Sequence, residues 1–192
     1  MSLAIARQVV SQIKALGIAS TNRPADRATY GEDVVRDRNQ ALMDAYWEGG
    51  ALALEGKAKV KAIAAAVRLH RIGNCEEKAY LAFDMLATRG VRPLELMAVS
   101  QPDDDPPDTV RGAISGIQED FGGPDHAFVV IGRVGGNLRD YRTWNEGTVV
   151  CDPWAGRAYY CELFDEEMEL IRRVTGGYTR TQLVVEHRQG AW

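Results

Sequence analysis

Three residues, Cys75, His126 and Asp152, have the side chains that a thiol enzyme needs, namely a nucleophile, a base and an acid. Cys75 follows a short loop and opens a segment, 75–90, whose pattern predicts a helix that stops at Gly90. At a helix start the backbone N–H groups are unpaired, and the helix dipole favours negative charge. A thiol in such a place loses its proton more readily, and the thiolate is the nucleophile. The sequence therefore favours a chemical role for Cys75 over that of an inert buried thiol.

The chemistry that these three residues predict is attack on an amide carbonyl. An imidazole beside the thiol forms a thiolate–imidazolium pair, and the imidazolium then protonates the leaving amine. A carboxylate on the other ring nitrogen fixes the tautomer and stabilises the positive charge. We expect Cys75 to attack, His126 to carry the proton and Asp152 to orient His126, with the Cys75 backbone N–H donating to the oxyanion. The second oxyanion donor is open, and the candidates are Asn74, Asn39 and Gln40.

His126 and Asp152 are expected to be neighbours because a hairpin joins the strands that carry them. The runs "HAFVVIGRV" (126–134) and "GTVVCD" (147–152) are apolar and β-branched, with a polar, glycine-rich connection between them. A hairpin brings the start of one strand close to the end of its partner. The plain alternatives are a strand-end histidine and a turn aspartate before a proline.

The remaining cysteines are expected in the core. Cys151 points to the opposite face from Asp152 by strand alternation, and Cys161 is also expected to be buried. Asn74 is expected beside the substrate cleft, and Trp154 and Trp144 are expected to wall it near the hairpin, the plain alternative being simple packing.

The spacing of apolar residues changes near residue 90, from helical spacing before it to short apolar runs after it. Helices are expected within 1–20, 33–50, 54–71 and 75–90, with a polar connection over 20–33. Strands are expected at 94–100, 126–134, 147–152, 157–163 and 181–188, and a last helix at 165–177. An acidic loop over 101–108 and a short helix within 109–123 complete the prediction. Helices first and strands afterwards indicate an α+β fold with an antiparallel sheet.

At 192 residues the chain is expected to form a single domain, 1–192, with a helical subregion (1–70) and a catalytic helix plus antiparallel sheet (71–192). A net charge of -4 gives no indication of nucleic-acid binding, and no apolar run reaches the roughly 18 residues that span a bilayer. The N-terminus lacks the pattern of a cleaved secretory signal, and its apolar spacing predicts a helix that packs on the domain. Three cysteines do not form a disulfide framework. We expect a cytoplasmic protein, or an effector exported without a cleaved signal peptide.

The segments around the three residues resemble the papain-like superfamily of cysteine enzymes, in its transglutaminase-like branch. The resemblance rests on "GNCEEKA" (73–79), "HAFVVIG" (126–132) and "VVCDPW" (149–154), and it covers roughly residues 70–160. It implies a cysteine at a helix N-terminus, a histidine on one strand and an aspartate on the next. Similar helix starts occur in bacterial effectors and toxins of this superfamily.

Two features depart from the pattern of those relatives. Glu76 and Glu77 stand in the first helical turn, where their charges suit the helix dipole but repel a thiolate, and many relatives have a small residue in place of Glu76. Papain-type peptidases carry a glutamine a few residues before the cysteine, and this chain has Leu69, His70 and Arg71 there.

Together these observations predict a thiol-dependent hydrolase or acyl transferase on protein or peptide amide bonds, that is, a cysteine protease, a deamidase or a transglutaminase-like enzyme. The triad does not separate these outcomes, because the acceptor depends on cleft shape and water access. The alternative is a non-catalytic binding or effector module that retains a papain-like fold. No cofactor is implied, and a zinc site of Cys75, His126 and Cys151 would lack two ligands on one rigid element. The oligomeric state stays open.

Overall fold

A computed structural model describes residues 2–100, 126–175 and 182–188 of the chain. Within these ranges the fold is α+β, as the sequence predicts, with the helices mostly in the N-terminal half. The strands form a 5-stranded antiparallel sheet in the order β4-β3-β2-β1-β5. The predicted acidic loop (101–108) and short helix (109–123) lie outside the described residues.

The bounds of the elements follow the sequence pattern closely in most places. The α-helices are α1 (Ser2–Ala15), α2 (Pro24–Tyr30), α3 (Glu32–Glu48), α4 (Gly56–His70), α5 (Cys75–Thr88) and α6 (Phe164–Thr175). The strands are β1 (Leu94–Ser100), β2 (His126–Ile131), β3 (Val149–Asp152), β4 (Arg157–Tyr160) and β5 (Gln182–Arg188). Short 3-10 turns cover η1 (Ala51–Ala53), η3 (Tyr141–Thr143) and η4 (Cys161–Leu163).

The polar connection expected over 20–33 is wrong, because α2 occupies much of it. Pro24 stands in the first turn of α2, where its missing N–H costs nothing, and Asp26 favours the helix dipole. The helix buries no residue, so no apolar periodicity marks it in the sequence.

Two predicted strands are too long at their C-terminal ends. The run 126–134 pairs only as far as Ile131, because Gly132 turns the chain with a φ of 81°. The run 157–163 pairs as far as Tyr160, and Cys161 then begins the turn η4. In both places the prediction extends a strand into residues where the chain turns, 132–134 and 161–163.

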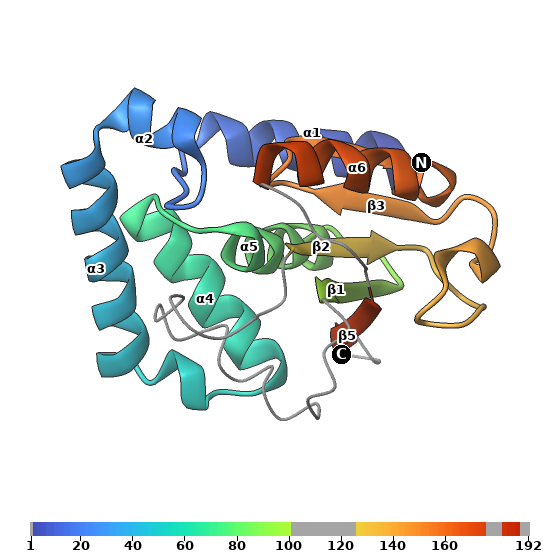
Figure 1. Ribbon diagram of the computed structural model, residues 1–192. Coiled ribbons are helices and arrows are strands. Elements are labelled where there is room, and N and C mark those ends of the chain that lie inside the picture. The colour runs from blue at the N-terminus through green and yellow to red at the C-terminus, as the bar shows by residue number, and fades with distance from the viewer. Residues whose placement is uncertain (1, 101–125, 176–181, 189–192) are drawn as a thin grey trace.

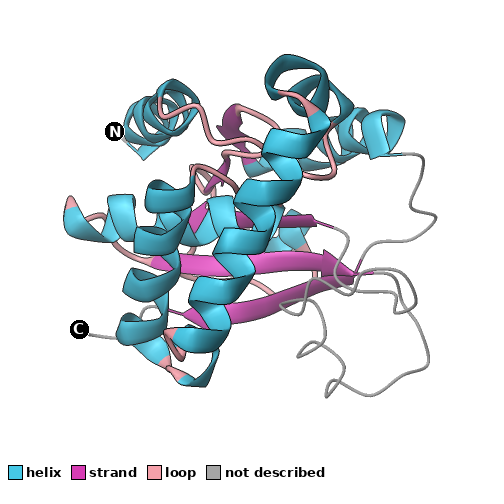
Figure 2. Ribbon diagram, turned by 90° about the vertical axis from the view of Figure 1, so that its left-hand side faces the viewer, coloured by secondary structure: helices cyan, strands magenta, loops and turns pink. Residues whose placement is uncertain are grey.

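The sheet is covered on both faces, and the strands alternate between two apolar clusters. Ala127, Val129 and Ile131 of β2 face the cluster that includes α1, α4 and α5. Phe128 and Val130 face the second cluster, to which α6 contributes. Figure 1 shows β3, β2 and β1 side by side with α5 against β2, and Figure 2 shows the helical layer in front of the strands.

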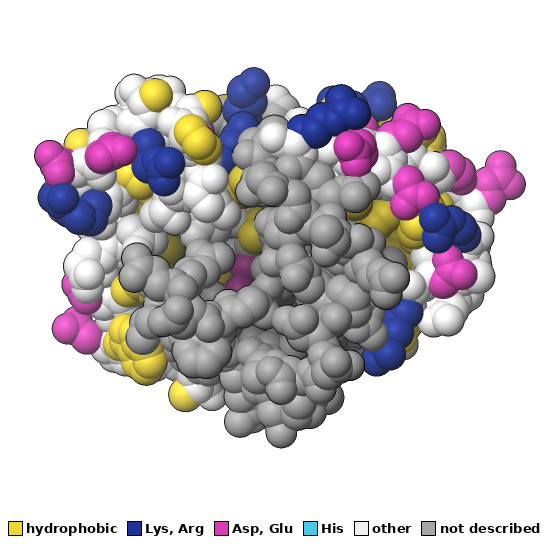
Figure 3. Space-filling model, viewed as in Figure 1, with side chains coloured by type: hydrophobic (Ala, Val, Ile, Leu, Met, Phe, Trp, Pro, Cys, Tyr) yellow, Lys and Arg dark blue, Asp and Glu magenta, His cyan; other side chains and the backbone are white. Residues whose placement is uncertain are grey.

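The N-terminal helix packs on the domain, as its apolar spacing predicts. The buried residues of α1 are Ala6, Val9, Val10 and Ile13, and the helix lies against α5, β3 and β4. Each large aliphatic side chain buried in this way contributes about 1.5–3 kcal/mol to the free energy of unfolding. On the surface, acidic and basic side chains of the described residues are interspersed over the face drawn in Figure 3. None of the described helices combines the length and the apolar character that crossing a bilayer requires.

Candidate active site

His126 and Asp152 form a buried pair across the β2–β3 hairpin. The register pairs Val130 with Val150, so strand alternation turns both side chains to the same face of the sheet. His126 Nε2 lies 2.5 Å from Asp152 Oδ2, and the two residues are 2% and 0% exposed. Because a carboxylate only accepts hydrogen bonds, Nε2 carries the proton and Nδ1 is the nitrogen left for another partner.

The Asp152 carboxylate is itself held in place by the backbone. Its second oxygen, Oδ1, accepts a hydrogen bond from the Ala155 N–H at 2.9 Å. The turn after β3 therefore fixes the carboxylate before it meets the imidazole, and the predicted adjacency of His126 and Asp152 is present in the structure.

Cys75 is the first residue of α5, and the N-terminus of this helix is well capped. Asn74 is the N-cap, and its backbone N–H donates to Glu77 Oε2 at 2.8 Å in a capping box. Burial raises the pKa of Glu77, and the hydrogen bond from the Asn74 N–H opposes that shift. Glu77, one of the two carboxylates expected to repel a thiolate, thus caps the helix and accepts a hydrogen bond from the backbone.

Cys75 meets His126 where the N-terminus of α5 reaches the sheet. The thiol is half-buried and packs against both apolar clusters, whereas Cys151 and Cys161 are buried, and all three are free cysteines. Burial lowers the pKa of His126, but the charge and hydrogen bond of Asp152, with those of Cys75, outweigh it and raise the pKa to about 10. The surroundings therefore favour an imidazolium at neutral pH, as a thiolate–imidazolium pair requires.

Asn74 and Trp154 both contact the segment between α1 and α2, whereas Trp144, the other tryptophan expected at the cleft, lines a different pocket at η3 and η4. The Trp154 ring meets the His126 ring edge to face, with the centroids 5.4 Å apart, and its indole Nε1–H donates to Asn22 Oδ1 at 3.0 Å. Asn74 Oδ1 accepts from the Thr21 N–H and from Thr21 Oγ1, both at 3.0 Å. Asn74 and Trp154 thus flank the triad, and the loop 20–23 joins them.

The other candidate oxyanion donors lie on α3, which packs against α2 and α4 (Figure 1). Gln40 donates its side-chain amide to Asp44 Oδ1 at 2.8 Å. Within the described part of the chain, neither Asn39 nor Gln40 forms a hydrogen bond with the triad. The spacing of apolar residues in α3 predicted a helix, but it did not show that this helix packs against α2 and α4.

Sequence reasoning missed the residues that join the α1–α2 loop to α5. Lys78, 3% exposed and one turn beyond Cys75, donates from Nζ to Ser20 Oγ at 2.7 Å, and Ser20 Oγ donates to the Gly73 carbonyl at 2.9 Å. Burial lowers the pKa of Lys78 to about 8, against the opposing charge of Asp26. A lysine on the apolar side of a predicted helix is the signal that could have indicated a buried polar partner.

The zinc alternative is not supported by the geometry, because the three proposed ligands do not meet. Cys151 faces the α1 side of the sheet, with Sγ 3.9 Å from the Ala6 carbonyl oxygen, and His126 faces the other side. Over residues 2–100, 126–175 and 182–188, no three His, Cys, Asp or Glu side chains are grouped to hold a metal ion.

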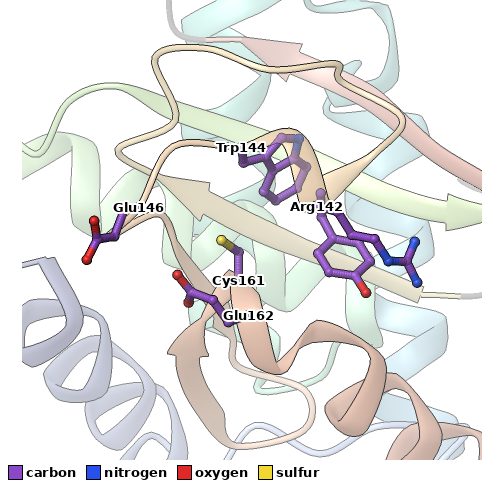
Figure 4. Close-up of a pocket in the computed structure, with 6 residues that line it drawn as sticks. Arg142, Trp144, Glu146, Cys161 and Glu162 are labelled. Atoms are coloured by element: carbon purple, nitrogen blue, oxygen red, sulfur yellow. The ribbon is translucent and has the colours of Figure 1, made fainter.

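A separate open pocket of about 440 Å³ lies at η3 and η4, and none of the triad residues lines it. Figure 4 shows Trp144 and Cys161 facing this space, with Glu146 and Glu162 on one side and Arg142 on the other. Burial raises the pKa of the Cys161 thiol, and the charge of Glu162 adds to the increase. No imidazole lines this pocket.

Comparisons of the chain with protein-family models, with curated proteins and with solved structures gave no match. The functional interpretation therefore depends on the residues and geometry of this chain.

Proposed function

We propose that the protein is a thiol-dependent hydrolase or acyl transferase that acts on amide bonds of proteins or peptides. The observation that carries the proposal is the buried His126–Asp152 contact of 2.5 Å, together with the interaction of the same imidazole with Cys75 at the N-terminus of α5. A nucleophile, a base and a residue that orients the base are the three roles of a catalytic triad.

In the acylation step, the Cys75 thiolate forms a bond to the carbonyl carbon of the amide, and the π electron pair moves to the oxygen. The resulting oxyanion accepts a hydrogen bond from the Cys75 backbone N–H. When the C=O bond re-forms, the C–N bond breaks and the His126 imidazolium gives its proton to the departing nitrogen. The product is a thioester of Cys75 and a free amine, or ammonia when the substrate is a glutamine side chain.

In the second step, an acceptor attacks the thioester while neutral His126 takes the proton of the acceptor. Water as acceptor gives hydrolysis, that is, proteolysis or deamidation, whereas an amine gives a transamidation product. In both cases the thiolate leaves, and the thiolate–imidazolium pair is regenerated. Asp152 keeps the His126 ring oriented throughout, because its own oxygens are held by Ala155 and by His126.

The fold proposal is a papain-like core of the transglutaminase-like kind. Its support is the nucleophile at a helix N-terminus packed on an antiparallel sheet, with His126 and Asp152 on adjacent strands. The order of the three residues along the chain agrees with the resemblance that the motifs show.

The proposal is tested by incubating wild-type protein and the Cys75→Ala variant with cell lysate and mapping the changes by mass spectrometry. New peptide termini indicate proteolysis, a gain of about one dalton at glutamine indicates deamidation, and loss of ammonia with a new cross-link indicates transamidation. The matched control is Cys161→Ala, which removes a thiol outside the triad and should behave like wild type. If wild type and Cys75→Ala give the same products, the alternative of a non-catalytic binding or effector module replaces the proposed enzyme.

A further inference from the structure

We propose that Asn22 is a catalytic residue whose side-chain Nδ2 donates the second hydrogen bond to the oxyanion formed at Cys75. The inference rests on the proposed function and assigns to it a residue outside the triad. A pair of donors fixed at the position of the developing negative charge accelerates acyl transfer more than a single backbone N–H.

The orientation of the Asn22 amide is set by its contact with Trp154. The indole Nε1–H, 3.0 Å from Asn22 Oδ1, can only donate, so the amide oxygen must face Trp154. The NH₂ group then points away from the indole. Among the described residues Nδ2 has no hydrogen-bond acceptor, and Asn22 is exposed, so two N–H donors are available to a bound substrate.

Asn22 contacts both Asn74, at the start of α5, and Trp154, beside His126. Its backbone N–H donates to Asn74 Oδ1 at 3.4 Å, and Asn74 directly precedes Cys75. Its side chain meets Trp154, whose ring contacts the His126 ring. Asn22 therefore links the N-cap of the helix that Cys75 opens to the tryptophan that contacts His126.

The loop that carries Asn22 is held in place before any substrate binds. Arg23 Nη1 donates to the Trp154 carbonyl at 2.9 Å, and its guanidinium lies 5.4 Å from the centre of the Trp154 ring. On the other side, the Ser20 N–H donates to Asp26 Oδ2 at 2.9 Å, and Lys78 Nζ donates to Ser20 Oγ. Such anchoring matters because an oxyanion donor is effective when its position needs no reorganisation during the reaction.

Two small probes separate this role from nucleophilicity. With p-nitrophenyl acetate, the Cys75 thiolate bonds to the carbonyl carbon, an oxyanion forms, and its collapse re-forms C=O and expels p-nitrophenolate. With iodoacetamide, the thiolate displaces iodide from a saturated carbon, so no oxyanion forms. The ratio of the two rate constants, acylation over alkylation, therefore reports the oxyanion donors independently of how much thiolate is present.

The experiment measures this ratio at Cys75 in full-length wild type, Asn22→Asp and Asn22→Ala. Asn22→Asp keeps an acceptor for Trp154 but removes the N–H donors, whereas Asn22→Ala removes both, so the two together separate donation from anchoring. We expect the ratio to fall on the order of 10²-fold in both variants, as loss of one oxyanion donor does in other enzymes. Cys75→Ala supplies the background of the remaining cysteines.

The outcomes distinguish the two proposals. Equal ratios in wild type and both variants, with rapid acylation of wild-type Cys75, would overturn the assignment of Asn22 and leave the proposed function standing. A fall only in Asn22→Ala would also overturn it, because the lost contact would then be the anchor to Trp154. Wild-type Cys75 that is not acylated faster than the background would overturn the proposed function and the Asn22 assignment with it.

Discussion

Cys75 and Cys161 both lie beside polar side chains, but their surroundings differ. Cys161 lines an open pocket with Trp144, Glu146 and Glu162, and its surroundings raise the pKa of the thiol. Cys75 opens α5 and interacts with His126, whose own pKa is raised. A carboxylate next to a thiol keeps it protonated, whereas an imidazolium stabilises the thiolate. The open pocket at η3 and η4 and the more reactive thiol are therefore expected in different places.

The two regions share one apolar cluster, so packing alone does not distinguish them. The ring centroid of Tyr141, beside the pocket, lies 4.8 Å from that of Phe164, and the centroids of Phe164 and Phe128 are 5.5 Å apart. The ring centroid of Phe128 in turn lies 6.1 Å from that of His126. These rings form a continuous path between the sites. What differs is the His126–Asp152 pair, which lies at the Cys75 end of this path.

The largest expected effect separates the two thiols directly. Cys75→Ala should lower the rate of amide or ester turnover by about 10³-fold or more, because the nucleophile is lost. Cys161→Ala should leave the turnover rate unchanged, because no imidazole lines the pocket that holds Cys161. The measurement is steady-state hydrolysis by both variants with circular dichroism as a check on folding, and equal losses in the two would contradict the comparison.

A smaller effect is expected when the orienting carboxylate is made neutral. Asp152→Asn keeps an oxygen for the Ala155 N–H but weakens the stabilisation of the His126 imidazolium. We expect turnover to fall on the order of 10²- to 10⁴-fold, with substrate affinity little changed. Measured kcat and KM give the test, and a variant as active as wild type would show that Asp152 only terminates β3.

The pH dependence of stability should report the same pair. The pKa of His126 is raised from 6.5 to about 10, so the folded protein binds the proton of this imidazole more tightly than the unfolded protein does. The stability that this pair contributes is therefore fully present below about pH 6.5 and is lost as the pH rises towards about 10.

Denaturant unfolding of wild type and His126→Gln between those pH values isolates the effect, since Lys78 and the other titratable groups are common to both proteins. The difference in unfolding free energy between the two should shrink as the pH rises. A difference that grew with pH would contradict the assigned direction.

The sheet and the adjacency of His126 and Asp152 were predictable from local patterns. Apolar alternation fixed which face each strand residue takes, and the hairpin connection fixed which strand ends meet. The first helical turn was also readable, because Asn74 and Glu77 have the types and spacing of a capping box.

The α1–α2 loop could not be predicted, because its contacts are non-local. Asn22 and Arg23 meet Trp154 more than a hundred residues further along the chain, and nothing in a polar connection indicates that partner. The short helix α2 was missed for a related reason: it buries no side chain, so only Pro24 and Asp26 mark it.

Site-resolved alkylation by iodoacetamide at neutral pH tests directly whether Cys75 is an activated nucleophile. Mass spectrometry of tryptic peptides gives separate rates for Cys75, Cys151 and Cys161 in wild type and in His126→Gln. We expect Cys75 to react first in wild type and to lose most of its lead in His126→Gln, because the imidazolium stabilises its thiolate. If wild-type Cys75 reacts no faster than Cys151 and Cys161, then Cys75 is not an activated nucleophile and the proposed function is wrong.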